Sequence, residues 1–431
     1  MTLLRPPVEV LEIADALERA GFEAWCVGGA VRDALLGHPH LDWDLATSAR
    51  PADVQRLFKR TVAVGIEHGT VGVLDRHGRM HEVTTFRRDV KTDGRHAEVE
   101  FGVSLDDDLA RRDFTINAMA WSTSREELRD PFGGQRDLGA QLLRAVGDPE
   151  ARMREDRLRA LRAIRFSARL GFRIEPDTWR AVEGSARDMH RLSAERIRQE
   201  LEKTMAQVRR PSEALSLWRL SGIADAVLPP LMRVSELALR STDQLAMPGL
   251  AGRPQRALNR LTALFVELGA EQVRATMKAL RASNADVRWL SDVAERWAKV
   301  GGPMEAALRE GDAEPRLVRR WVATIGRTRV GAFARVAAAR WAAARALGQP
   351  APTAAGVRAL HRRMLHAAWR EPVELSDLAV DGGDLLEAGI ASGPAVGRML
   401  SALHELVLED PARNTVAGLL AEARRRSRPG A

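Results

Sequence analysis

The sequence predicts an α+β fold in which a small N-terminal head with a mixed sheet is followed by an all-helical region. Nearly all strand-like patterns lie within about the first 145 residues, and helical periodicity continues from there almost to the end. With 431 residues, the chain also exceeds what one hydrophobic core usually serves, so several domains are expected. We expect a head at residues 1–147, a helical neck at 148–211, a helical body at 212–345 and a helical tail at 346–431.

The head combines short strands with short helices. Residues 23–29 (EAWCVGG) are an apolar run closed by two glycines, and residues 41–47 (LDWDLAT) alternate in polarity. Residues 70–87 predict two strands joined at Asp75–Gly78. The predicted helices of the head cover residues 1–21, 31–36 and 51–59, the last with Pro51 at a favourable first position.

The helical region is interrupted by segments rich in proline and glycine. Such residues end helices or turn the chain. We expect breaks at residues 227–231 (VLPPL), 247–254 (MPGLAGRP), 300–304 (VGGPM) and 347–353 (LGQPAPT).

The composition excludes several classes of protein. There is one cysteine, Cys26, so a disulfide framework and a cysteine zinc site are excluded, and a reducing cytoplasm fits. No apolar run of about 18 residues occurs, so no membrane span is expected. The formal net charge of +8 favours a polyanionic partner such as nucleic acid, although a GC-rich genome also inflates arginine content.

Two aspartates stand one residue apart in the strand predicted at residues 41–47. Side chains alternate between the faces of a strand, so Asp42 and Asp44 point one way and Trp43 the other. Two carboxylates that project together repel unless a cation lies between them, and Mg²⁺ takes carboxylate oxygens together with substrate phosphates. Asp42 and Asp44 are therefore candidate catalytic residues and metal ligands. The alternative is a surface strand with two solvated aspartates.

A glycine turn and an arginine precede the two aspartates. Gly28 and Gly29 would let backbone amides approach a triphosphate, and Arg32 would add a charged clamp. This spacing favours a site for phosphoryl transfer.

These residues lie within segments that resemble a known family. Residues 28–37 (GGAVRDALLG), followed by Asp-Trp-Asp at 42–44, are similar to motif A of class II tRNA nucleotidyltransferases and bacterial poly(A) polymerases, in the polymerase-β superfamily. Segments that resemble later parts of the family follow in the family's order: residues 108–121 (DLARRDFTINAMAW), 130–138 (DPFGGQRDL), 155–172 (EDRLRALRAIRFSARLGF) and 192–201 (LSAERIRQEL). Residues 374–415 resemble the tail of these enzymes.

The resemblance implies a polymerase-β-like head and an enzyme that adds CCA to tRNA. It would transfer CMP, CMP and then AMP from CTP and ATP to the tRNA 3′ end, with release of pyrophosphate. The resemblance also implies Mg²⁺ as cofactor and a cytoplasmic location, and it implies no protein partner. Glu82 becomes a candidate third catalytic carboxylate, because related folds often complete the metal site from a later strand; the alternative is a strand glutamate that faces solvent.

Residues 108–121 carry three candidate nucleotide contacts. Arg112 could bind a phosphate, while Asp113 and Asn117 could hydrogen-bond the ribose 2′-hydroxyl that distinguishes ribonucleotides. The alternative is a helix start with an acidic first turn.

Residues 155–172 predict a helix on which Asp156 and Arg159 are neighbours, with Arg162 and Arg165 following. Cytosine and adenine both offer an amino donor beside an acceptor, so a fixed Asp acceptor beside an Arg donor can pair with either base. Guanine and uracil present the reverse arrangement and are refused. Arg162 and Arg165 would support the triphosphate or the reading pair. The alternative is a basic helix face linked by salt bridges.

Two further segments resemble parts of the family. Residues 87–101 resemble its flexible loop, which is associated with the switch to A addition, and their glycine and mixed charges suit a mobile lid. In the tail, Pro394 fits the first position of a helix behind Gly393. This helix start either docks the tRNA elbow or is simply a cap.

Three alternative functions remain open from the sequence. A bacterial poly(A) polymerase shares the first motifs, but residues 58–74 and the tail look more like the tRNA enzymes. An enzyme that adds only A is a second alternative. A catalytically silent RNA-binding relative is the third, and the Asp42 and Asp44 pair counts against it.

Overall fold

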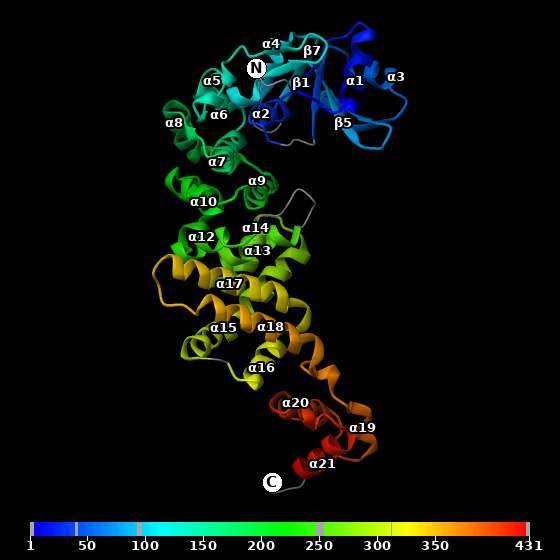
Figure 1. Ribbon diagram of the computed structural model, residues 1–431, viewed down its shortest axis with the longest axis vertical. Helices are drawn as coiled ribbons and strands as arrows, with labels where there is room; N and C mark the ends of the chain where they lie inside the picture. Colours follow the sequence, from blue (N-terminus) through cyan, green and yellow to red (C-terminus); the bar gives the residue numbers. More distant parts are fainter. Residues whose placement is uncertain (1–3, 39–41, 93–96, 247–253, 312, 428–431) are drawn as a thin grey trace. The chain divides into compact units, whose positions relative to one another are not determined.

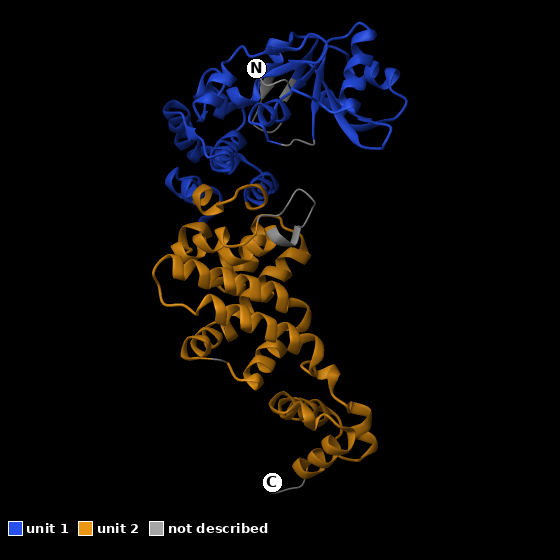
Figure 2. Cartoon of the chain, viewed as in Figure 1, with its two compact units in different colours: residues 1–204, 216–229 blue, residues 205–215, 230–431 orange. Residues whose placement is uncertain are grey.

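The computed structural model describes residues 4–38, 42–92, 97–246, 254–311 and 313–427. They form two compact units, which Figure 2 shows in blue and orange. The first consists of residues 1–204 and 216–229, and the second of residues 205–215 and 230–431. The finer division into head, neck, body and tail stays a prediction.

The first unit contains a seven-stranded mixed sheet with the strand order β3-β4-β5-β2-β1-β8-β9 (Figure 1). Strands β2 and β5 run parallel, and the other neighbours are antiparallel. Two small sheets lie outside it, antiparallel β6-β7 and parallel β10-β11. The strands are β1 Ala24–Val27, β2 Asp44–Thr47, β3 Thr61–Gly65, β4 Thr70–Leu74, β5 Met80–Thr85, β6 Arg87–Thr92, β7 Ala97–Phe101, β8 Ala120–Ser122, β9 Glu127–Arg129, β10 Leu142–Leu143 and β11 Arg173–Ile174.

The first unit also contains helices, and all described elements of the second unit are helical. The first unit holds α1 Val8–Arg19, α2 Gly29–Leu35, α3 Pro51–Leu57, α4 Leu105–Ala110, α5 Gly134–Gly139, α6 Pro149–Glu155, α7 Leu158–Leu170, α8 Pro176–Ser185 and α11 Ile223–Val227. Two helices contribute residues to both units, α9 Ala194–Gln207 and α10 Pro211–Leu220. The second unit holds α12 Glu236–Asp243, α13 Pro254–Phe265, α14 Ala270–Ala279, α15 Asn284–Glu310, α16 Pro315–Ile325, α17 Val330–Ala346, α18 Ala354–Arg370, α19 Gly382–Glu387, α20 Pro394–Glu409 and α21 Val416–Ser427.

The seven-stranded sheet has one covered face and one face that is partly open. Helices α1 and α3 pack against it on the covered face, where side chains such as Val71 and Val83 are buried. On the other face, Trp25 of β1 packs in an apolar cluster with Leu109 of α4. The remainder of that face carries exposed side chains from β2, β5 and β3. This open part holds the candidate site.

Two apolar clusters are defined by described residues of the second unit. The larger joins α15, α16, α17 and α18 around buried residues that include Trp321 and Trp341. The smaller holds α19, α20 and α21 together and includes Leu385 and Leu403. Helix α20 begins with Pro394 behind Gly393, as the sequence predicts. None of the helices in the described ranges is long and apolar enough to cross a membrane.

The α+β class is confirmed, and so is the order in which a region with a mixed sheet precedes a helical region. The predicted hairpin is confirmed as β4 and β5, and the helix predicted at Pro51 is confirmed as α3. The predicted break at 347–353 lies between α17 and α18 as expected. Most of the break predicted at 247–254 lies outside the described residues.

The break predicted at residues 300–304 is wrong. Helix α15 continues through Pro303, which lies inside it. Val300, Met304 and Leu308 around this proline are buried in the larger core. Tertiary burial of the apolar face therefore outweighs the hydrogen bond that proline removes.

Residues 87–101 also differ from the expected loop. Their described part forms the antiparallel strands β6 and β7, with Arg87 opposite Phe101. An ion pair of 2.7 Å between Arg88 and Glu100 links the two strands. Cross-strand pairs of this kind stabilise a hairpin, and the residues that join the strands lie outside the described ranges.

Candidate active site

The two aspartates occupy the positions that strand alternation predicts. Asp44 is the first residue of β2, Asp42 lies two residues earlier, and both are exposed, unlike the residue between them. In the parallel pair of β2 and β5, Leu45 lies opposite Val83, so Asp44 lies opposite Glu82 one residue earlier. Asp44 and Glu82 therefore belong to one face of the sheet, and Asp42, just before the strand, is close enough for its charge to act on Asp44.

The electrostatics of Asp44 support this grouping. Its side chain reaches solvent, but surrounding atoms partly desolvate the carboxyl group. This desolvation, and next the charge of Glu82, raise the pKa of Asp44 to about 6; the charge of Asp42 adds to the shift and that of Arg112 opposes it. A bound cation would offset the repulsion between the carboxylates and favour the ionised form of Asp44.

The chemistry of the donors fits a divalent cation that arrives with a nucleotide. Within the described ranges, no three His, Cys, Asp or Glu side chains are gathered closely enough to enclose a metal ion. Two carboxylates suffice for Mg²⁺, because this ion is usually held by one or two carboxylates together with substrate phosphates and waters. The role of Glu82 as a third catalytic carboxylate stays a prediction.

Cys26 lies in β1 beside this site and is fully buried. Burial, and then the charge of Asp44, raise the pKa of the thiol to about 12. Because the thiolate is the nucleophilic form of cysteine, this burial disfavours a nucleophilic role for Cys26.

The glycine turn joins β1 to α2. Gly28 has a φ of 73°, which favours glycine, and precedes Gly29, the first residue of α2. A Cβ at Gly28 would come within 2.9 Å of a terminal nitrogen of Arg112, so this guanidinium lies over the turn. Asp108 holds Arg112 there through an ion pair of 3.1 Å. A backbone turn and a cation thus lie next to the carboxylate of Asp44.

A row of hydrogen bonds connects α2 to α7 through the 3-10 helix Thr115–Asn117. Arg32 donates to the side-chain oxygen of Asn117 at 2.6 Å, and the amide nitrogen of Asn117 donates to Asp113 at 2.9 Å. Arg162 donates to the other oxygen of Asp113 at 2.8 Å. Burial acts to raise the pKa of Asp113, but the charge of Arg162 and these bonds hold it below its usual value.

Arg32 is more buried than a phosphate clamp is expected to be. Its residue is 2% exposed, and its guanidinium also pairs with Asp33 at 2.6 Å. Burial lowers the pKa of Arg32, and the charge of Asp33 counteracts this. To reach a phosphate directly, Arg32 has to exchange one of these partners.

Arg165 is also buried and pairs with Glu200 of α9 at 2.7 Å. The guanidinium groups of three arginines lie over the ring of Phe166, that of Arg32 at 5.1 Å, Arg162 at 5.3 Å and Arg165 at 4.5 Å from the centroid. The negative face of an aromatic ring attracts cations, so Phe166 helps to hold these three positive charges close together.

The prediction that Asp156 and Arg159 are neighbours on one helix is wrong. Helix α6 ends at Glu155, and Asp156 has an extended backbone with φ −146° and ψ 105°. An oxygen of Asp156 accepts the backbone N–H of Leu158 at 3.0 Å, at the start of α7. Aspartate side chains compete in this way for backbone N–H groups and interrupt helices.

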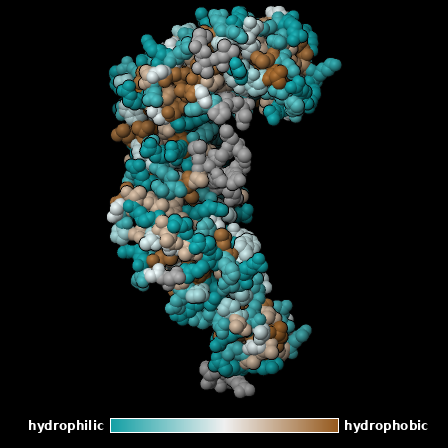
Figure 3. All heavy atoms as spheres, viewed as in Figure 1, coloured by the Kyte–Doolittle hydropathy of each residue, from teal (hydrophilic) through white to brown (hydrophobic). Residues whose placement is uncertain are grey.

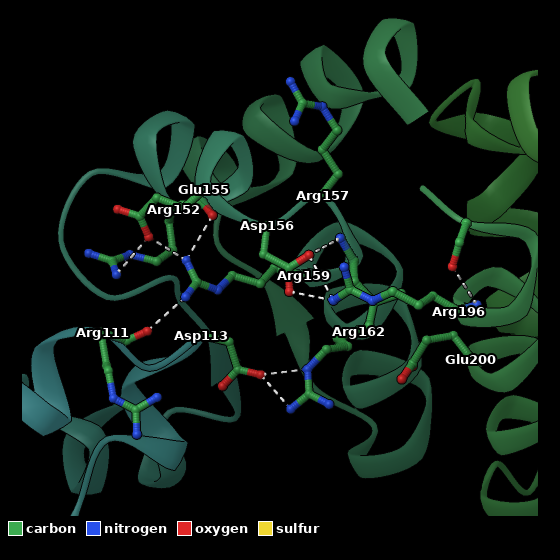
Figure 4. A network of polar contacts seen from close by, with 12 residues as sticks. Arg111, Asp113, Arg152, Glu155, Asp156, Arg157, Arg159, Arg162, Arg196 and Glu200 are labelled. Atoms are coloured by element: carbon green, nitrogen blue, oxygen red, sulfur yellow. Dashed lines mark hydrogen bonds and ion pairs between the residues drawn. The ribbon is translucent and has the colours of Figure 1, made fainter. Parts of the chain in front are cut away.

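Asp156 and Arg159 are instead each held by other partners, as Figure 4 shows. One guanidinium nitrogen of Arg196, from α9, donates to both carboxylate oxygens of Asp156 at 3.0 and 2.8 Å. Arg159 donates to Glu155 at 2.6 Å and to the backbone carbonyl of Arg111 at 2.8 Å. The two residues remain adjacent, because the backbone N–H of Arg159 bonds the carbonyl of Asp156 at 3.0 Å.

Three further residues belong to this network although their sequence pattern does not single them out: Arg196, Glu155 and Glu200. Arg196 and Glu200 lie within residues 192–201, which resemble a family motif. Their spacing of four places them on one face of a helix. That face turns toward α7 and the segment before it, since their partners are Arg165 and Asp156.

Comparison with known proteins identifies the family of the chain. Residues 24–144 match the family described as the poly A polymerase head domain. Residues 171–234 match the family described as the probable RNA and SrmB- binding site of polymerase A.

Nearly the whole chain is similar to CCA-adding enzymes. It is 37% identical to the one from Limosilactobacillus fermentum over 420 residues, 95% of each chain. It is 33% identical to the one from Leuconostoc citreum over 430 residues, 98% of this chain and 97% of that one. The structure of the Bacillus stearothermophilus CCA-adding enzyme in complex with CTP matches with a TM-score of 0.78 and 32% identity, covering 98% of this chain and 99% of that one. The chain therefore belongs to the class II CCA-adding enzymes, within the tRNA nucleotidyltransferase and poly(A) polymerase family.

Proposed function

We propose that this chain completes the 3′ end of tRNA by adding CMP, CMP and then AMP from CTP and ATP, without a template and with release of pyrophosphate. One observation carries the proposal. In a chain of this family, Asp44 and Glu82 share a sheet face beside a glycine turn that Arg112 covers. This is an arrangement that binds a nucleoside triphosphate next to paired carboxylates.

The residues around the turn would position the triphosphate. Gly28 and Gly29 would let backbone amides approach the phosphates, and Arg112, which lies over Gly28, supplies a guanidinium that Asp108 keeps in place. Asp42 and Asp44 would hold Mg²⁺, which when bound stabilises the charge that develops at the reacting phosphate. Arg32, Arg162 and Arg165, gathered around Phe166, would raise the positive potential that the triphosphate meets.

Asp156 and Arg159 would read the incoming base. The Asp156 side chain is 31% exposed, so its oxygens can accept from an amino group while Arg196 fixes their position. Arg159, fixed by Glu155, would donate to the neighbouring ring acceptor. Guanine or uracil would leave buried groups unpaired, at a cost of about 1–3 kcal/mol for each mismatch.

Asp113 and Asn117 would hydrogen-bond the ribose 2′-hydroxyl of the nucleotide. Both residues are buried, at 8% and 6% exposure, and the row between Arg32 and Arg162 uses their polar groups. The contact therefore requires one of these hydrogen bonds to be exchanged. We also propose a cytoplasmic location, tRNA docking by the tail, and no obligatory protein partner.

The function is tested by incubating the purified chain with tRNA that ends at the discriminator base. We expect CTP alone to add two residues, ATP alone to add little, and both nucleotides together to add CCA. A poly(A) polymerase would instead extend with ATP alone, and an A-adding enzyme would require tRNA that already ends in CC. A silent RNA-binding relative would release no pyrophosphate with any substrate.

The predicted lid gives a second test. Replacing residues 89–96 with a Gly-Ser linker is expected to lower AMP addition by about tenfold or more, while CMP addition stays within about twofold. The reason is that this segment resembles the loop associated with the switch to A addition. Single-turnover rates of both steps measure the effect, with CMP addition as the internal control. Equal loss of both steps would show a general role in folding or catalysis.

A further inference from the structure

The open face of the sheet continues past the carboxylates as an apolar surface. Gly72 of β4 lies opposite Glu82 of β5, and Val62 of β3 lies opposite Gly72. One row across the sheet thus runs from Val62 through Gly72 and Glu82 to Asp44. Met80 lies two residues before Glu82 and shares its face.

Three large apolar side chains on this surface are exposed. Val62 is 42% exposed, Val64 43% and Met80 47%. A Cβ at Gly72 would come within 2.9 Å of a methyl group of Val64 and 2.7 Å of the Met80 sulfur, so these two side chains meet above the glycine. We call Val62, Val64 and Met80 the apolar platform. Figure 3 shows that apolar side chains, in brown, reach the surface of the head among hydrophilic ones.

The strand order places the platform and the phosphate turn on opposite sides of the carboxylates. The turn follows β1, the carboxylates lie on β2 and β5, and the platform lies on β5 and β3 at the edge of the sheet. In phosphoryl transfer, the attacking and leaving oxygens lie roughly in line at phosphorus. If the triphosphate occupies the β1 side, the attacking group must approach from the β5 side.

The chemistry of this region suits the end of an RNA strand. The faces of bases and riboses are apolar and pack on exposed apolar side chains, whereas phosphates need cations. Arg60 borders the platform. It lies two residues before Val62, on the same face, and its carbonyl accepts the N–H of Leu74 in the neighbouring strand. Its guanidinium donates to the carbonyl of Asp75 at 3.3 Å, at the hairpin turn, and leaves a positive charge at the rim.

We propose that the apolar platform is the acceptor subsite, on which the 3′-terminal nucleotide of tRNA packs so that its hydroxyl faces the carboxylates. This inference rests on the proposed function, because it takes tRNA as the acceptor. The apolar platform would position the attacking RNA strand, whereas the residues around the glycine turn would hold the nucleotide.

The first test uses the variant Val64→Ser/Met80→Ser in the full chain. We expect the KM for tRNA lacking CCA to rise about tenfold, with the KM for CTP and the melting temperature unchanged. Leu57→Ser is the matched control, because Leu57 is 36% exposed in α3, which packs on the covered face of the sheet. An unchanged KM for tRNA, or an equal rise in both KM values, would overturn the proposal. A wild-type dimer that the substitutions dissociate would also overturn it, because the platform would then be an interface between copies.

The second test needs neither a variant nor catalysis. An acceptor-stem RNA lacking CCA, with 4-thiouridine at its 3′ end, is photocrosslinked to the wild-type chain, which is then digested with trypsin. The platform is divided between the peptides 61–76 and 80–87, and we expect crosslinks in one or both. Crosslinks found only in other peptides would refute the subsite. If the wild-type chain fails to extend this RNA with CTP and ATP, the proposed function fails, whatever the crosslinks show.

Discussion

The variants Asp42→Ala and Asp44→Ala are expected to lose nucleotide incorporation by roughly a thousandfold or more. We expect this because Asp42 and Asp44 lie together at the open sheet face, where the charges of Glu82 and Asp42 raise the pKa of Asp44. Removing either carboxylate removes a ligand for the divalent cation and so weakens the counter-charge that the cation would bring to the triphosphate. Affinity for tRNA should stay within a few fold, because phosphate contacts elsewhere supply most of it.

Incorporation rates at saturating Mg²⁺, together with tRNA binding by filter retention, measure both effects. Asp15→Ala is a suitable control, because Asp15 is a half-exposed carboxylate on α1, which packs on the covered face. Ordinary turnover in either active-site variant would show that the metal assignment is wrong. Loss of tRNA binding together with activity would instead indicate misfolding.

The second large effect concerns the choice of base at Asp156 and Arg159. Asp156→Ala should reduce discrimination against UTP and GTP by roughly tenfold or more, because the acceptor for the amino group of C and A is lost. Arg159→Ala should lower the use of both CTP and ATP, since both need its donors. Asp156→Asn is the sharper variant. Its amide oxygen can still accept the N–H of Leu158, while its amino group offers a donor that suits uracil.

Arg196 should act through Asp156 rather than on the base. Arg196→Ala is expected to raise the KM for CTP and ATP together, because the carboxylate loses the donor that fixes it at 2.8–3.0 Å. In a background that already carries Asp156→Ala, the same substitution should have little further effect on either KM. Additive losses in this double-mutant cycle would show that Arg196 has a role independent of Asp156.

Part of the geometry of the candidate site could be predicted because its signals are local. The alternation of Asp42, Trp43 and Asp44 determines which side chains share a face, and a positive φ at Gly28 needs only the glycine itself. The pairing of β2 with β5 could not be predicted from local signals. Parallel strands are joined by a long connection, which does not determine which residues lie opposite each other. The position of Glu82 opposite Asp44 therefore became visible only in the structure.

The two wrong helix predictions have physical causes that a local sequence pattern does not reveal. In one case a side chain hydrogen-bonds the backbone, and in the other the helix packs against distant residues. Asp156 fits a helical pattern by spacing, yet its carboxylate takes the N–H of Leu158 and ends the preceding helix. Pro303 looks like a helix break, yet the buried faces on both sides of it keep α15 continuous. The burial of Arg32 could not be predicted either, because one of its partners, Asn117, is distant in the sequence.

The central claim is that side chains, not a template strand, select the base. The direct measurement is kcat/KM for all four ribonucleotides on tRNA lacking its terminal CCA, with the wild-type chain and with Asp156→Ala, Asp156→Asn and Arg159→Ala. Melting temperatures of the same preparations separate changes in recognition from loss of folding. The account predicts that the ratio of CTP to UTP use falls by roughly tenfold or more in Asp156→Ala and falls further in Asp156→Asn. Unaltered ratios across the four nucleotides, however far total activity dropped, would contradict it.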